Sequence, residues 1–164
     1  MSPAEAFATR AHAGQLDKGG RPYIEHPARV AARARQIAER LEYPSHVADG
    51  CEAAGWLHDT IEDTGTTQED LHAAEFPGAV VRAVQLLSRP AGVPYAGFIQ
   101  AIIDSGDVVA LLVKLADVED NTNPARPSTA TLPRSLHARY GSAKYSLRNA
   151  IRLGGREPLH AGQW

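Results

Sequence analysis

Apolar side chains recur every three or four residues along most of the chain, with polar side chains between them. This spacing gathers the apolar residues on one face of a helix, and that face is available for burial. The pattern therefore predicts an all-α fold. The helices predicted in this way cover residues 3–13, 27–41, 45–58, 67–74, 77–87, 95–103, 108–116 and 133–153.

Residues 108–116 are apolar on nearly every side except at Lys114. Such a segment is either a central helix or a buried strand, and its valines favour the strand. We expect a helix, because its neighbours are helical and no second strand candidate is available to pair with it. The chain, residues 1–164, is thus predicted to form one all-α domain of about seven to eight helices around this buried helix.

Several residues have side chains suited to helix ends. Pro27 suits the first position of its helix, because its missing N–H would be unpaired there in any case. Ser45 can cap the next helix, and Thr66 or Thr67 can cap the short helix that follows. The polar stretch 121–133, which contains three prolines, predicts a loop.

The composition is that of an ordinary globular protein, with 43% hydrophobic and 22% charged residues. A net charge of −2 argues against a nucleic-acid partner, which would require a basic patch. No apolar run approaches the length of about 18 residues that a membrane span needs, and the N-terminus lacks the pattern of a signal peptide. The single Cys51 has no partner for an internal disulfide, so a cytoplasmic protein is expected.

The stretch LHDTIEDT, residues 57–64, places a histidine and three carboxylates within six residues. His58 should point inward, because it continues an apolar helical stripe formed by Val47, Cys51 and Ala54. A buried histidine beside Asp59, with Glu62 and Asp63 one turn further on, concentrates negative charge where charge is costly. A divalent cation would relieve that cost. For an isolated pair, however, a core histidine hydrogen-bonded to an acidic cap or loop residue is the favoured explanation.

Two more residues qualify as metal ligands. His26 lies directly before Pro27, and Asp117 ends the apolar segment, where a carboxylate is expensive unless it is paired. Together with His58 and Asp59 they would form a mixed nitrogen and oxygen shell. Such a shell suits Mn²⁺, Fe²⁺ or Zn²⁺ better than a closed structural zinc site, which would use cysteines. The sequence separations are too wide for a local motif, so spacing alone leaves the set open.

Four motifs, in this order, resemble those of a known family. They are HAGQ at residues 12–15, PYIEHP at 22–27, LHDTIEDT at 57–64 and KLAD at 114–117. The chain resembles the HD superfamily of metal-dependent phosphohydrolases and, more specifically, the hydrolase domain of the RelA/SpoT homologues. The resemblance implies a single HD domain over residues 1–164, acting as a stand-alone small alarmone hydrolase. Such an enzyme removes the 3′-pyrophosphate of (p)ppGpp with one divalent metal ion, most simply Mn²⁺.

The resemblance also implies roles for individual residues. The metal ligands would be His26, His58, Asp59 and Asp117. The attacking water would be positioned and activated by Glu62 and Asp63. The nucleotide would be bound by Lys18, Asn121 and Tyr145. The expected partner is a small-molecule nucleotide, with no nucleic-acid or membrane partner, and an oligomer is compatible with the sequence.

Two positions depart from the family pattern. Asp17 stands where the family usually has an arginine that stacks on guanine, and Val118 stands where an arginine usually follows the last ligand. An aspartate does not stack as a guanidinium does, and it repels phosphate. The substrate is therefore open among (p)ppGpp, an adenine alarmone, a dinucleotide such as NADPH and other nucleotides. A nucleotide phosphomonoesterase and a non-catalytic nucleotide sensor are the alternative functions.

Overall fold

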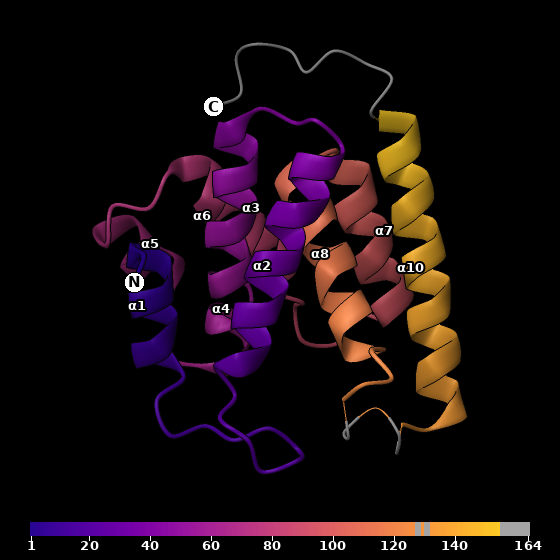
Figure 1. Cartoon of the computed structure of the whole chain (residues 1–164), viewed down its shortest axis with the longest axis horizontal. Helices are drawn as coiled ribbons and strands as arrows, with labels where there is room; N and C mark the ends of the chain where they lie inside the picture. The colour runs from indigo at the N-terminus through magenta and orange to yellow at the C-terminus, as the bar shows by residue number, and fades with distance from the viewer. Residues whose placement is uncertain (127–128, 130–131, 155–164) are drawn as a thin grey trace.

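The computed structural model describes residues 1–126, 129 and 132–154 (Figure 1). This described part is all-α, and its only β-type pairing is an isolated bridge between Leu16 and Pro22. The helices are α1 (Pro3–Ala11), α2 (Glu25–Arg40), α3 (Ser45–Leu57), α4 (Thr60–Asp63), α5 (Gln68–Ala73), α6 (Gly78–Leu87), α7 (Tyr95–Ser105), α8 (Val108–Asn121) and α10 (Arg134–Gly154). None of the helices in the described ranges is long and apolar enough to cross a membrane.

Helix α8 lies at the centre of the bundle (Figure 1). Its residues 109–118 are all buried, and it packs against α2, α3, α6, α7 and α10. A helix that is covered on every side has to be apolar on nearly every side, which explains the unbroken apolar run. The predicted central helix is confirmed, and the strand alternative is wrong.

The ends of two helices differ from the prediction. Helix α8 continues five residues beyond Ala116, so Asn121 is its last helical residue and not the first residue of a loop. Helix α2 begins at Glu25, which places Pro27 third in the helix. This position still lacks an intrahelical acceptor for an N–H group, so the proline costs no hydrogen bond. Leu41 lies beyond α2 and is 48% exposed, so its predicted burial is wrong.

Capping residues were predicted with mixed success. Thr67 caps α5 through a capping box with Asp70, as expected. Ser45, in contrast, is the first residue of α3 and makes no capping hydrogen bond, because Pro44 occupies the cap position. The short helix α4 was not predicted, because four residues are too few for a periodic pattern.

Helices α2 and α3 approach each other closely at Gly55. A Cβ atom on Gly55 would lie only 2.5 Å from Cα and 2.8 Å from the backbone nitrogen of Ala31. Glycine is therefore the only residue that this approach accommodates without movement of the backbone. The contact brings His26 near the start of α2 next to His58 at the end of α3.

Helix α10 packs against α7 and α8 and completes the bundle (Figure 1). Its predicted stripe is buried at Ala143, Leu147 and Ile151. Leu136 and Tyr140, nearer its start, are only partly buried. The start of α10 lies beside the start of α7, where the ring of Tyr140 contacts that of Tyr95.

Candidate metal centre

Two histidines point one ring nitrogen each into the centre of the site. Nδ1 of His26 lies 2.7 Å from Oδ2 of Asp120, and Nδ1 of His58 lies 2.8 Å from the carbonyl oxygen of Gly55. A carbonyl or carboxylate oxygen only accepts, so Nδ1 carries the hydrogen in both rings. The Nε2 atoms are thereby left to face the site. Metal-binding histidines are commonly oriented in this way, by an acceptor for the hydrogen on the other ring nitrogen.

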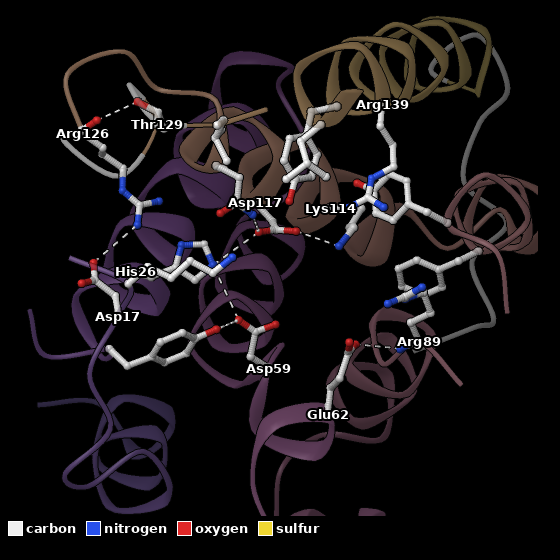
Figure 2. A pocket seen from close by; sticks show the side chains of 18 of the residues that line it. Asp17, His26, Asp59, Glu62, Arg89, Lys114, Asp117, Arg126, Thr129 and Arg139 are labelled. Carbon is white, nitrogen blue, oxygen red and sulfur yellow. Dashed lines mark hydrogen bonds and ion pairs between the residues drawn. The ribbon is translucent and has the colours of Figure 1, made fainter. Parts of the chain in front are cut away.

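Two carboxylates meet these nitrogens, and Figure 2 shows Asp59 and Asp117 beside His26. Oδ2 of Asp59 lies 3.0 Å from Nε2 of His58 and 3.6 Å from Nε2 of His26. Oδ1 of Asp117 lies 3.3 Å from Nε2 of His26 and 3.9 Å from Nε2 of His58. One donor atom each from His26, His58 and Asp117 lies within 4.8 Å of the other two. The structure therefore brings together all four residues that the sequence singled out as ligands.

The donor set fits a divalent metal ion. Nε2 of His58 is buried and has no hydrogen-bond partner among the described residues, although a carboxylate of Asp59 lies close to it. A buried polar atom left without a partner is costly, and a cation would satisfy it. Two imidazoles and two carboxylates, with no cysteine, form a set typical of Mn²⁺, Fe²⁺ or catalytic Zn²⁺. The cluster formed by His26, His58 and Asp117 could therefore hold a divalent metal ion.

Opposite charges at the centre stabilise the ionised forms of Asp117 and His26. Burial disfavours the charged form of Asp117, but Lys114, whose Nζ donates to Oδ2 at 2.7 Å, keeps the pKa of this carboxyl well below its usual range. Asn121 donates to Oδ1 of the same carboxylate at 2.6 Å. Burial also opposes protonation of His26, but hydrogen bonds to Asp117 and Asp120 outweigh it and raise the His26 pKa to about 9.

Asp120 supports the site from behind His26. Its carboxylate accepts from Nε of Arg29 at 2.7 Å and from the guanidinium of Arg126. Burial opposes its charge, but the bonds from His26 and Arg29 lower the Asp120 pKa to about 2. The neighbouring Glu119 instead pairs with Arg33 and Arg148, neither of which lines the cleft. Asp120 is thus a fixed acceptor that orients the imidazole.

The carboxylates of α4 lie beside the ligands. Glu62 lines the cleft, and its Oε2 accepts the backbone N–H of Arg89 at 2.9 Å. The hydroxyl of Tyr23 lies 2.6 Å from Oδ2 of Asp59 and 3.0 Å from Oδ2 of Asp63. Burial and then the charge of Asp59 raise the Tyr23 pKa far above its ordinary value, so the phenol stays protonated and donates. Asp63 is exposed and is not among the residues that line the cleft.

The cleft above the centre has a volume of about 480 Å³ and two chemically different ends (Figure 2). Asp17 and Arg126 lie at one end. Arg89, Lys114 and Arg139 lie at the other end. The ring of Phe98 lies beside Lys114, and the rings of Tyr95 and Tyr140 lie beside Arg139. The metal-ligand candidates lie between the two ends.

Two of the three predicted nucleotide-binding residues line the cleft. Lys18 and Asn121 line the cleft, whereas Tyr145 is 71% exposed and is not among the lining residues. Of the two departures from the family pattern, Asp17 lines the cleft, and its Oδ1 accepts the backbone N–H groups of Gly19 at 2.8 Å and Arg21 at 2.9 Å. Val118 is fully buried in the hydrophobic core and does not line the cleft.

Sequence reasoning missed several residues of the site. Asp120 could have been found, because it follows Asp117 by three positions and so shares a helix face with it. Arg89, Arg126 and Tyr95 come from loops and helix starts distant in the sequence, and no spacing relates them to the ligands. Only the packing of the helices brings them into the cleft.

Comparison with known proteins agrees with this geometry. Residues 23–122 match the family model described as HD domain. The guanosine-3′,5′-bis(diphosphate) 3′-pyrophosphohydrolase of Haemophilus influenzae is 32% identical over 124 residues, which cover 70% of this chain and 17% of that protein. The bifunctional (p)ppGpp synthase/hydrolase SpoT of Escherichia coli is 32% identical over 129 residues, covering 74% of this chain and 17% of that protein.

A GTP pyrophosphokinase of Myxococcus xanthus is 39% identical over 71 residues, covering 43% of this chain and 8% of that protein. The chain thus spans less than a fifth of the length of these relatives. A solved structure of a metazoan ortholog of SpoT, described as hydrolyzing ppGpp, superposes with a TM-score of 0.62. The two share 20% sequence identity over 92% of each chain, which establishes the common fold.

Proposed function

The chain belongs to the HD domain family, and from this premise we propose that it is a metal-dependent hydrolase that removes the 3′-pyrophosphate of (p)ppGpp or a related alarmone. One observation carries the proposal: one donor atom each from His26, His58 and Asp117 lies within 4.8 Å of the other two, beside a cleft of about 480 Å³. The names of the relatives from Haemophilus influenzae and Escherichia coli support the choice of reaction.

We propose that His26, His58, Asp59 and Asp117 hold one divalent ion, Mn²⁺ in the first instance, with Fe²⁺ or Zn²⁺ as alternatives. Such an ion supplies Lewis-acid polarisation of a phosphoryl oxygen and a more acidic water. The protein contributes orientation: the hydrogens on Nδ1 of the two histidines are held by Asp120 and by a backbone carbonyl, so both Nε2 atoms stay turned inward.

Glu62 is the proposed proton acceptor, because it lines the cleft one helical turn beyond the ligands. The backbone N–H of Arg89 occupies Oε2 and fixes the carboxylate, so Oε1 is the atom proposed to take the proton of the attacking water. Asp63 is proposed to assist by positioning α4 and not by contact with the substrate. Its carboxylate shares the Tyr23 hydroxyl with Asp59, and this link sets the position of α4 relative to the ligands.

Lys18 and Asn121 are proposed to contact the nucleotide from the cleft wall. Tyr145 does not line the cleft, so its contact with the nucleotide remains a prediction. We further propose that residues 1–164 act as one HD domain, which the packing of α10 against α7 and α8 supports. The protein is proposed to act in the cytoplasm on a small-molecule nucleotide, without a nucleic-acid or membrane partner. This proposal is compatible with an oligomer.

The test is product identification. The Mn²⁺-loaded protein is incubated with ppGpp, ppApp, NADPH and simple nucleotides, and the products are separated by ion-exchange chromatography. Release of pyrophosphate is expected. Release of orthophosphate alone would establish a phosphomonoesterase instead, and tight binding without turnover would establish a sensor.

Two variants separate metal binding from proton transfer. Asp59→Ala is expected to abolish metal binding, measured by calorimetry, together with activity. Glu62→Gln is expected to keep the metal and to lose about 10² to 10⁴ in rate, the usual range for a general base. Glu69→Gln, at an exposed position on α5 outside the cleft, is the matched control and should change neither quantity. Normal turnover by Glu62→Gln would refute its assignment as the base.

A further inference from the structure

The motif HAGQ at residues 12–15 does not line the cleft, and the metal-ligand candidates do not include it. The backbone N–H of Gln15 donates to the carbonyl oxygen of His12 at 3.0 Å, which closes a tight turn directly after α1. Gly14 lies inside this turn with a φ of +77°, a conformation that glycine adopts without strain. The turn brings the two polar side chains together, with Nδ1 of His12 2.8 Å from Oε1 of Gln15.

The hydrogen bonds of the Gln15 amide fix its orientation. Its Nε2 donates to the backbone carbonyl oxygen of Asp63 at 3.1 Å, and a carbonyl oxygen only accepts. Oε1 therefore faces His12, and Nδ1 of that ring carries the hydrogen. Asp63 is the last residue of α4, so its carbonyl has no partner inside the helix. His12 and Gln15 thus form a relay of two hydrogen bonds from the end of α1 to the end of α4.

The burial of His12 indicates that this relay matters. The residue is 2% exposed, and among the described residues its Nε2 has no hydrogen-bond partner. A buried polar atom without a partner is costly, and phenylalanine or leucine would avoid that cost. The imidazole packs beside the ring of Tyr23, with 5.0 Å between the centroids, which an apolar side chain could also do. In the described part of the chain, the side-chain bond to Gln15 is what an imidazole adds at this position.

Helix α4 depends on support from outside. Its four residues are too few to be stable as a helix on their own. The carboxylate of Glu62 accepts the backbone N–H of Arg89 at 2.9 Å, and the carboxylate of Asp63 accepts from the hydroxyl of Tyr23 at 3.0 Å. Both of these bonds end on side chains of α4. The bond from Gln15 instead holds the backbone, at the residue directly after Glu62, and so helps to fix the direction of the Glu62 side chain.

We propose that His12 and Gln15 are positioning residues, which hold α4 so that the Glu62 carboxylate is directed at the attacking water. In taking Glu62 as the proton acceptor, this inference rests on the proposed function. Neither residue of the relay lines the cleft, so both act through α4. Loss of the relay should therefore lower kcat and leave KM and metal affinity unchanged, because the metal ligands and the walls of the cleft stay in place.

The first experiment removes the relay with little change in volume. Gln15→Met is expected to lower kcat about tenfold, with KM and the calorimetric Mn²⁺ affinity changed less than about twofold. His12→Phe should act in the same way. His12→Asn, whose amide places an N–H near the position of Nδ1, should recover most of kcat. Gln100→Met is the matched control, because it removes an exposed hydrogen bond on α7 outside the cleft, and it should change none of these values.

A double variant separates a positioning role from a general loss of structure. In Glu62→Gln the proton acceptor is already lost, so adding Gln15→Met should lower kcat by less than about twofold. A further fall of about tenfold in the double variant would show that the relay acts through another part of the molecule, and it would overturn the inference. Wild-type kcat in the single variant Gln15→Met would overturn it as well.

The second experiment needs no catalysis. Hydrogen–deuterium exchange of the backbone amides is followed by NMR in wild type and Gln15→Met. The N–H groups of Asp63 and Thr64, which donate to the first turn of α4, should exchange about tenfold faster in the variant, whereas those of α6 should not change. Equal exchange in α4 would overturn the relay. If no 3′-pyrophosphate is released from any substrate, the proposed function fails, and this measurement still decides whether Gln15 holds α4.

Discussion

Replacing Gly55 by alanine tests whether α2 and α3 meet as closely as the structure shows. The new methyl group would lie 2.5 Å from Cα and 2.8 Å from the nitrogen of Ala31, and both are backbone atoms. No side-chain rotation can relieve such a clash, so the helices would have to separate by about 1 Å to restore ordinary contact. This perturbation falls on a helix pair that contributes a histidine from each member.

The size of the effect follows from two opposing contributions. Overpacking costs about 1–3 kcal/mol, and a clash with rigid backbone belongs at the upper end. Alanine gains about 1 kcal/mol over glycine inside a helix. We therefore expect Gly55→Ala to lower the free energy of unfolding by about 2 kcal/mol, which corresponds to a fall in Tm of about 4–8 °C for a chain of this size.

Gly50→Ala is the matched control, because Gly50 lies on the same helix and is also buried. A Cβ atom there would meet only Cγ2 of Val109, at an ordinary 3.6 Å. This variant should be as stable as the wild type or about 1 kcal/mol more stable. Urea unfolding followed by circular dichroism measures both variants. Calorimetric Mn²⁺ titration should also show about tenfold weaker binding for Gly55→Ala only. If the two variants unfold alike, the close approach at Gly55 is refuted.

Three further predictions concern other parts of the molecule. Asp120→Asn should weaken Mn²⁺ binding about 10- to 100-fold in a calorimetric titration, because the imidazole of His26 loses its charged acceptor. The control Glu119→Gln should bind Mn²⁺ as the wild type does. Equal Mn²⁺ affinities of Asp120→Asn and the wild type would contradict the orienting role of Asp120. Tyr23→Phe should lower kcat about tenfold with little change in Tm, because it loses only the hydroxyl between two carboxylates, and Tyr43→Phe should have no effect on kcat. Burial raises the pKa of the Cys51 thiol to about 12. Iodoacetamide at pH 8 should therefore modify Cys51 only after unfolding in guanidinium, as mass spectrometry would show. Rapid labelling of the native protein would refute the burial of Cys51.

The fold was largely predictable because most helices bury one apolar stripe. The stripe that ends at His58 is buried throughout, and the continuous apolar run of α8 marks the central helix. The prediction stopped α8 too early because Asp117 and Asp120 interrupt the apolar pattern. Both carboxylates are in fact buried. Lys114 on the same helix, together with His26 from α2, compensates Asp117. His26, Arg29 and Arg126, all from other elements, compensate Asp120. A sequence pattern cannot show that compensation before the helices are packed.

The site residues could be predicted only where they belong to a recognisable sequence motif. The adjacent pair His58 and Asp59 was visible at once, whereas the distant His26 and Asp117 needed the resemblance to a family. Arg89 and Arg139 carried no signal, because fifty residues separate them and only the packing of α10 beside α7 places both in the cleft. Sequence reasoning thus reached the chemistry of the centre sooner than the walls of the cleft.

Anomalous diffraction from crystals soaked in Mn²⁺ tests the central claim most directly. One strong peak is expected, about 2 Å from Nε2 of His26 and Nε2 of His58 and within bonding distance of the carboxylates of Asp59 and Asp117. The same crystals of Asp117→Ala should show that peak weakened or lost. A site without density between these four side chains, or a peak bound elsewhere in the cleft, would contradict the account.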